Sequence, residues 1–207
     1  MHLADRCRIV LSGAATALAA AALFAAPASA LAPAPAAGCP ALPTVQPFTP
    51  WQDAADYILA PDGGFEAGAA GWLLQGGART VEGNEPFKVG RAADHTSLRL
   101  PAGSSAATAP MCIGVEHRTM RFFADAASSG ALVVTATFTK RNGNQKSVRL
   151  GVARGSNAWA PSNVLPMRVN EKAEHFDNAI WVSLSFTPRN ADAWLIDDVY
   201  IDPFRFK

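Results

Sequence analysis

The feature that most constrains this chain is a strand–turn–strand pattern near its middle. Residues 131–140, ALVVTATFTK, alternate between two faces, as a half-buried β-strand does. The apolar face consists of Leu132, Val134, Ala136 and Phe138. The next residues include Asn142-Gly143, which predicts a type I′ turn because both central residues of that turn need positive φ. A return strand is therefore predicted over residues 146–152, and its apolar face consists of Val148, Leu150 and Val152.

The same kind of short strand recurs along the chain. Residues 180–186 alternate clearly, with inward residues Ile180, Val182, Leu184 and Phe186. Further strands are predicted at 72–75, 78–82, 96–100, 109–115, 119–124, 164–169 and 193–201. Helical spacing is present only in residues 51–59, for one or two turns. Many short strands separated by Gly, Pro, Asn and Ser clusters predict an all-β sandwich or barrel.

The N-terminus carries the features of an export signal. Arg6 and Arg8 precede an apolar stretch over residues 9–26, and Ala28-Ser29-Ala30 forms a small-residue cleavage site. We predict a cleaved signal peptide over 1–30, an Ala/Pro-rich linker and N-terminal extension over 31–56, and a β-sandwich domain over 57–207. The alternative is an uncleaved membrane anchor. With cleavage, we expect a secreted, extracellular protein with no transmembrane segment.

Charge argues against one large class of partners. Removing Arg6, Arg8 and Asp5 from the 18 basic and 17 acidic residues leaves 16 of each, so the mature chain is neutral. No basic stripe is present, and we therefore expect no nucleic-acid partner. The sequence does not indicate an oligomeric state.

Two cysteines remain after signal cleavage, Cys39 and Cys112. An even number of cysteines in an oxidising compartment predicts a disulfide, which would tie the N-terminal extension to the middle of the domain. The alternative is a lipid on Cys39, because Ala36-Ala37-Gly38 precedes it. Pro27, Pro33 and Pro35 separate it from the apolar stretch and weigh against lipidation.

Signatures of catalysis are missing from the sequence. There is no G-x-S-x-G elbow and no H-E-x-x-H helix, and the histidines are scattered. No pair of carboxylates stands out as a glycosidase pair, which is defined by a distance in space. Glu66 follows a Gly-rich corner and has three interpretations: a catalytic acid, a metal ligand or a solvated turn residue. We expect no enzyme activity.

Two motifs resemble a known family. These are PDGGFEAGAAGW at residues 61–72 and AWLIDDVYIDP at residues 193–203, and SLRLPAG at 97–103 is also similar. They resemble jelly-roll domains of the carbohydrate-binding-module type, also called galactose-binding-like. The resemblance implies an antiparallel β-sandwich of jelly-roll type with a short N-terminal extension. The whole chain also looks like a group of secreted proteins from high-GC bacteria, through motifs such as GNEPF (83–87) and RFFA (121–124).

The resemblance further implies one structural calcium ion where the first and last strands meet. Its ligands would be Glu66 and Asp197, with Asp198 as an alternate. Ca²⁺ takes six to eight oxygen ligands and accepts mixed carboxylates and carbonyls from distant segments. Successive strand residues point to opposite faces, so one aspartate would face the core unless a bulge or a cation intervenes. The alternative is a bulge whose aspartates pair with Arg or backbone N–H groups.

The resemblance implies a binding function, with a carbohydrate as the ligand. Sugar recognition uses aromatic faces with polar groups nearby, and the candidates are Trp181, Trp194, Arg99 and Arg149. The alternative for each tryptophan is a packing role, and for each arginine a solubilising role. We therefore predict an exported, non-catalytic carbohydrate-binding module. The alternative is a structural or adhesive cell-envelope protein that acts through protein–protein contacts.

Overall fold

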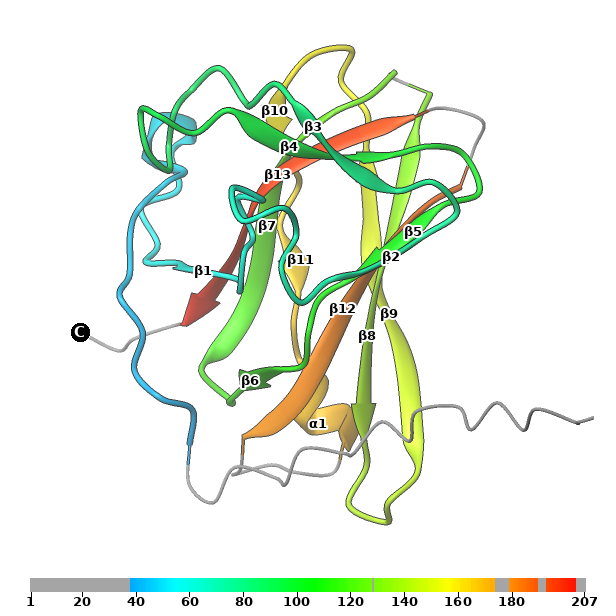
Figure 1. Cartoon of the computed structure of the whole chain (residues 1–207). Helices are drawn as coiled ribbons and strands as arrows, with labels where there is room; N and C mark the ends of the chain where they lie inside the picture. Colours follow the sequence, from blue (N-terminus) through cyan, green and yellow to red (C-terminus); the bar gives the residue numbers. More distant parts are fainter. Residues whose placement is uncertain (1–37, 128, 174–178, 190–192, 204–207) are drawn as a thin grey trace, which may run out of the picture. The chain divides into compact units, whose positions relative to one another are not determined.

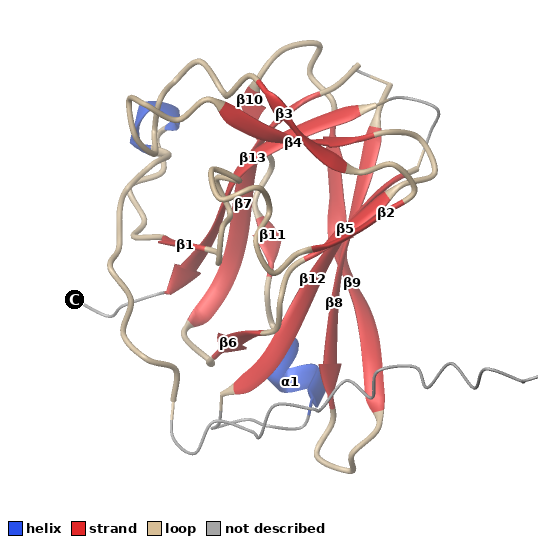
Figure 2. Cartoon of the chain, in the orientation of Figure 1, coloured by secondary structure: helices blue, strands red, loops and turns tan. Residues whose placement is uncertain are grey.

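The computed structural model describes residues 38–127, 129–173, 179–189 and 193–203. These residues form two antiparallel sheets that face each other, and Figures 1 and 2 show β7 with β13 in one sheet and β12, β8 and β9 in the other. The predicted antiparallel β-sandwich is confirmed. The predicted signal peptide lies outside the described residues. No helix in the described part of the chain is long and apolar enough to cross a membrane.

The first sheet has seven strands. Its main path is β10 (Ala160–Pro161), β7 (His117–Asp125), β13 (Trp194–Pro203), β4 (Thr96–Leu100) and β3 (Arg79–Glu82). Two short strands lie off this path: β1 (Ile58–Leu59) pairs with β13, and β11 (Leu165–Pro166) pairs with β7. The last strand thus lies at the centre of this sheet, between β7 and β4, and β1 also joins it.

The second sheet has six strands. Its main path is β2 (Leu73–Gln75), β5 (Ser105–Ala107), β12 (Ile180–Pro188), β8 (Ala131–Thr139) and β9 (Gln145–Arg154), and β6 (Met111–Ile113) pairs with β12. The helical pieces of the described chain are a 3₁₀ turn at Thr49–Trp51 and α1 at Val169–Ala173.

The alternation read from the sequence decides which side chains form the main core. The inward residues of β8 are 0–3% exposed, and those of β12 are equally buried. Each such apolar side chain contributes roughly 1.5–3 kcal/mol when it is removed from water. The two sheets therefore hold together through the residues that the period-2 pattern selects.

The hairpin between β8 and β9 is confirmed, but two of its predicted details are wrong. Gly143 has φ 82°, whereas Asn142 is not among the positive-φ residues, and the Gly143 N–H donates to the Lys140 carbonyl. This is the longer hairpin loop in which a turn is followed by one left-handed residue. A register shift between Val134 and Thr135 also changes which residues of β9 face inward beyond that point. Ala153 is therefore buried, whereas Val152 is only half-buried.

The predicted helix over 51–59 is wrong. The helical turn ends at Gln52, whose φ of 63° is left-handed, and the chain then extends toward β1. Tertiary packing explains the difference. Phe48 and Tyr57 join Phe123 and Tyr200 in a second apolar cluster on the outer face of the seven-stranded sheet. An extended segment brings Phe48 and Tyr57 to the same cluster, with ring centroids 4.9 Å apart.

Other differences concern short strands. The structure adds β5, where the small residues of Ser105–Ala107 carry no aromatic or β-branched signal and are held by pairing with β2 and β12. The strand predicted over 164–169 is reduced to β11, and α1 starts at Val169.

Candidate functional site: an acidic cavity beside the last strand

The site begins with a bulge in β13. Its pairing with β7 is regular up to Asp197, shifts, and resumes at Tyr200. Asp198 has φ 49°, and the next residue turns aside to pair with the corner after β1: the Val199 N–H donates to the Gly63 carbonyl at 3.0 Å. The bulge predicted as one outcome of two adjacent aspartates is therefore present, and it leaves both side chains outside the main core but buried.

Asp197 is satisfied by backbone donors. Its Oδ1 accepts the Asp198 N–H at 2.8 Å, and its Oδ2 accepts the Glu85 N–H at 3.4 Å. Burial, followed by the negative charge of Asp198, raises the pKa of Asp197 to about 9. The carboxyl group therefore favours its protonated form when no cation is near.

Asp198 has a different environment. The residue is 3% exposed, and no donor among the described residues hydrogen-bonds its carboxylate. Burial, followed by the charges of Glu85, Asp94 and Glu66, raises its pKa to about 7. Asp198 lines the cavity described below, and burial without a protein donor makes its ionised form costly.

The surrounding carboxylates are fixed by the backbone of residues 83–96. Glu85, which is 1% exposed, accepts N–H groups from Phe87, Lys88 and Val89. Asp94 accepts the Arg91 N–H at 2.6 Å. These bonds hold the acidic groups in place around Asp198.

Glu66 is fixed in the same way from the opposite segment. Its Oε1 accepts the N–H groups of His95 at 2.9 Å and Thr96 at 2.7 Å, and its Oε2 lies 3.1 Å from His95 Nδ1. Glu66 is an exposed residue, and its carboxylate joins the Gly-rich corner to residues 95 and 96. The Gly-rich corner matters here because a Cβ on Gly64 would lie 3.1 Å from Asp198 Oδ1.

These groups open onto a cavity of about 700 Å³, which we call the acidic cavity. Its carboxylate lining consists of Asp62, Glu66, Asp94 and Asp198, and Arg91 lies at its edge. The opposite wall is apolar and includes Leu42, Val45 and Leu59, which are 45%, 47% and 42% exposed. Polar groups that converge beside an apolar wall are typical of ligand sites.

The four residues predicted to bind ligand do not meet in one place. Arg99 and Trp194 line a second cavity of about 440 Å³ on the seven-stranded sheet. Trp194 is only 1% exposed, so it has no open ring face, and the predicted sugar-stacking role is wrong. Trp181 and Arg149 lie on the six-stranded sheet, on β12 and β9. Trp181 is half-buried and pairs in register with Cys112.

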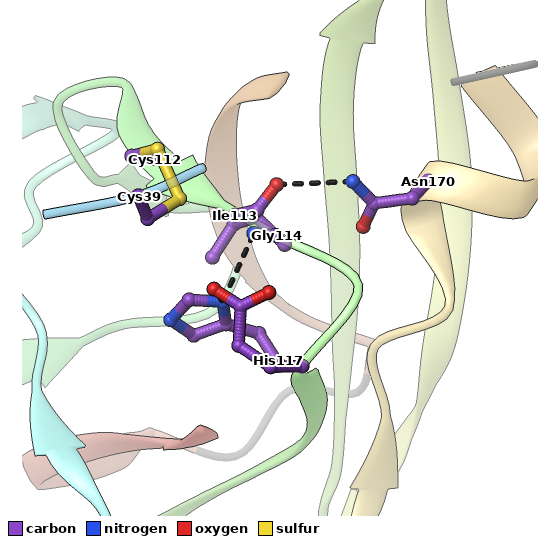
Figure 3. The surroundings of a disulfide bond; sticks show 7 residues. Cys39, Cys112, Ile113, Gly114, His117 and Asn170 are labelled. Atoms are coloured by element: carbon purple, nitrogen blue, oxygen red, sulfur yellow. Dashed lines mark hydrogen bonds and ion pairs between the residues drawn. A yellow bond between two sulfur atoms is a disulfide. The ribbon is translucent and has the colours of Figure 1, made fainter. Parts of the chain in front are cut away.

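The predicted disulfide is confirmed. Cys39 and Cys112 are joined across a Cα–Cα distance of 5.5 Å (Figure 3). Beside it, His117 is buried, and its Nδ1 accepts the Gly114 N–H at 2.9 Å. Burial lowers the pKa of His117, so the neutral imidazole is favoured. Donor atoms of Cys39, Glu116 and His117 lie within 4.8 Å of one another, but the disulfide occupies the sulfur that a metal would need.

Sequence reasoning found Glu66, Asp197 and Asp198 but missed Glu85 and Asp94. Both lie in a loop without periodicity, and each is recognisable only because its carboxylate accepts nearby backbone N–H groups. The segment GNEPFKVG contains both Glu85 and the three residues whose N–H groups it accepts, Phe87, Lys88 and Val89.

Comparison with known proteins gives the fold. No family model matches the chain, and no curated protein matches it. Among solved structures, the tandem CBM22-1–CBM22-2 domain of Paenibacillus barcinonensis Xyn10C has a TM-score of 0.50 at 15% identity, covering 73% of this chain and 46% of that one. The single xylan-binding CBM22-1 domain of the same protein has a TM-score of 0.45 at 16% identity and covers 72% and 99%.

A further structural neighbour is TmCBM61, solved in complex with β-1,4-galactotriose, with a TM-score of 0.39 at 17% identity over 70% of this chain and 97% of that one. The chain spans 28% of another neighbour, the Clostridium thermocellum xylanase 10B modules complexed with xylohexaose. Identities in this range carry no site residue from one protein to the other. The chain therefore has the β-sandwich fold of carbohydrate-binding modules, and the likeness shows the fold alone.

Proposed function

We propose that this chain is a non-catalytic carbohydrate-binding domain and that its saccharide lies in the acidic cavity. The observation that carries the proposal is the cavity itself, because it combines an apolar wall with fixed carboxylates beside an unpartnered one. A pyranose presents C–H groups on its faces and hydroxyl donors on its rim. The apolar wall at Leu42, Val45 and Leu59 could pack against the C–H groups of the sugar. The carboxylates of Glu66 and Asp94 could accept hydrogen bonds from its hydroxyl groups.

Absence of an enzymatic role is part of the same proposal. Two acidic groups of the cavity, Asp94 and Glu66, are held by backbone N–H donors. Asp198 and Asp197 have raised pKa values, yet each is almost fully buried. A binding role needs no catalytic acid.

We also propose that the acidic cavity holds one calcium ion at Asp198. The chemistry of the donors fits, since an unpartnered buried carboxylate is surrounded by other oxygen ligands and Ca²⁺ accepts six to eight of them. Asp94 and Asp198 would supply carboxylates from two segments, because their oxygens lie 2.5 and 3.4 Å from one point, the position of a Cβ on Gly90. Glu66 would supply a third. Asp197 stays a weaker candidate, because backbone donors already engage both of its oxygens. When bound, the ion would offset the charge that raises these pKa values.

The proposed saccharide site is tested by a charge on the apolar wall. We expect a soluble oligosaccharide identified on a glycan array to lose at least tenfold in affinity for Val45→Asp, measured by calorimetry. Val164→Asp is the matched control, because Val164 is 49% exposed and does not line the acidic cavity. Loss of affinity in Trp181→Ala with no effect of Val45→Asp would move the site to the six-stranded sheet.

The alternative role has its own signature. If no saccharide binds and sedimentation shows assembly that grows with concentration, the structural or adhesive cell-envelope function is favoured. Export is a separate proposal, since the predicted signal lies outside the described residues. Expression in a host that exports proteins should yield a chain that starts at Leu31, and an intact Met1 would contradict this.

A further inference from the structure

The apolar wall of the acidic cavity is made partly by the N-terminal segment that we call the strap, residues 39–45. Leu42, Pro43 and Val45 all line the cavity. In Figure 1 the strap is the blue trace that runs past β1 without joining a sheet over most of its length. The site therefore depends on a segment that belongs to neither sheet.

The downstream end of the strap is firmly held. Val45 and Tyr57 exchange two backbone hydrogen bonds of 2.9 and 2.8 Å. Phe48 follows and is 0% exposed, stacked on Phe123 with ring centroids 5.2 Å apart. Arg121 lies 4.4 Å from the centre of the Phe48 ring. This end stays in place through the aromatic cluster.

A partly buried ion pair between Arg121 and Asp53 also holds this end. Arg121 Nη1 lies 2.7 Å from Asp53 Oδ2, which also accepts the Tyr57 hydroxyl at 2.8 Å. Burial alone would raise the pKa of Asp53, but the hydrogen bonds from Arg121 and Tyr57 lower it. The residues after the strap are thus fixed independently of the disulfide.

The upstream end has one attachment. Between Cys39 and Thr44, no hydrogen bond joins the strap to another described residue, and Pro40 and Pro43 have no N–H to offer. Leu42 is 45% exposed, so its packing recovers only part of the free energy of full burial. The attachment is the Cys39–Cys112 disulfide, which ties the strap to β6.

We infer that the disulfide is a latch for the binding site: the upstream wall of the acidic cavity is in place only while Cys39 and Cys112 are bonded. The inference rests on the proposed function for its effect on ligand, but not for its effect on the strap. An external dithiol would deliver two electrons and two protons to the disulfide, leave two thiols, and become a cyclic disulfide itself. The strap from Cys39 to Thr44 then loses its attachment, and chain entropy favours release of Leu42 and Pro43.

The first experiment measures order in the strap itself. We expect ¹⁵N relaxation of the Leu42 and Thr44 amides to change, with order parameters falling from about 0.8 in the oxidised chain to below about 0.6 after reduction by dithiothreitol. The amides of Tyr57 and Phe123 should not change, which also shows that the sandwich remains folded. The Cys39→Ser/Cys112→Ser variant should behave as the reduced chain does. A strap that stays ordered after reduction overturns the inference, whatever binds in the cavity.

The second experiment measures binding of the oligosaccharide found on the glycan array. We expect about a tenfold loss of affinity in the reduced chain. The oxidised Leu42→Gly/Pro43→Gly variant should show a similar loss, and it keeps the disulfide in case reduction unfolds the chain. Unchanged affinity in both would overturn the role of the strap as a wall. If the strap is released but no saccharide binds the oxidised chain, the latch is supported and the proposed function fails.

Discussion

The six-stranded sheet and the acidic cavity follow opposite rules. In β8 and β12 every second residue is apolar and buried, and the polar residues between them remain half-exposed. Around the cavity the pairing of β13 with β7 is interrupted, and three acidic residues are buried. Glu85 and Asp197 accept backbone N–H groups, whereas Asp198 has no donor among the described residues. Regular alternation therefore builds the part that holds the protein together. Where the alternation is interrupted, negatively charged side chains lie close together, and such places are candidates for ligand sites.

The largest expected effect tests the regular side of this comparison. Phe186→Ala removes a fully buried ring that lies 5.7 Å from Trp72 and 5.4 Å from Phe122 between centroids. We expect a loss of about 3–5 kcal/mol in the free energy of unfolding, measured by urea denaturation. Thr187→Ala is the control on the same strand, because Thr187 is exposed and should change stability by less than about 0.5 kcal/mol.

The next effect concerns cation binding in the cavity. We expect EGTA to lower the melting temperature by about 5 °C or more relative to 1 mM Ca²⁺, since a ligand present at about 100 times its Kd adds about 2.7 kcal/mol. Asp198→Asn should abolish this response. It should also make the metal-free protein more stable, because it removes a charge that repels Glu85, Asp94 and Glu66. Identical melting curves with and without EGTA would refute the calcium site.

The pH dependence of the metal-free protein is a smaller effect of the same groups. Asp198 and Asp197 have pKa values raised from 3.8 to about 7 and about 9, so the folded chain binds more protons than the unfolded chain above pH 4. Stability is therefore highest below about pH 4 for this contribution and decreases as the pH rises through 7 and 9. We expect the free energy of unfolding to fall between pH 5 and pH 8, measured by urea denaturation in EGTA.

That pH effect has a clear control. Saturating Ca²⁺ should flatten the profile, since the bound ion favours the ionised carboxylates. Asp198→Asn should reduce the slope between pH 5 and pH 8. A metal-free protein that becomes more stable over this interval would show that other groups control the cavity.

The smallest effect tests the open face of the six-stranded sheet. Thr137 Oγ1 lies 2.9 Å from Ser147 Oγ, in an exposed pair across β8 and β9. Thr137→Ala should change the free energy of unfolding by less than about 0.5 kcal/mol, because water replaces an exposed hydrogen bond. It should also leave saccharide affinity unchanged. A large loss of affinity would mean that this face binds ligand and would end the contrast between the two regions.

Predictability follows the same division. The period-2 pattern identified the inward residues of β8 and β12, which are 0–3% exposed, without reference to the rest of the chain. The β9 register was not predictable, because the shift between Val134 and Thr135 has no sequence signal and exchanges Val152 for Ala153 on the inner face. The helix predicted over 51–59 failed because Phe48 and Tyr57 pack in a cluster whose other members are far along the chain.

For the site, the sequence identified several of the acidic residues but not which of them lie close together in space. Adjacent aspartates in an apolar strand required an explanation, and the structure supplies a bulge with Asp198 at positive φ. The resemblance favoured Asp197 as the ligand. We propose Asp198 instead, because backbone donors already engage both oxygens of Asp197. Trp194 looked like a binding residue from its residue type, but only its neighbours determine that its ring is enclosed.

The sequence by itself determined the all-β class, because local alternation needs no knowledge of distant residues. The even cysteine count predicted the Cys39–Cys112 pairing but left lipidation of Cys39 as an alternative. Only the tertiary structure decided which carboxylates are buried together, which side chains wall the cavity, and what holds the strap. The physical reason is that burial and electrostatic environment are properties of groups brought together in space. Asp198 and Glu66 are separated by more than half of the chain in sequence, and their relation exists only once β1 and β13 have paired.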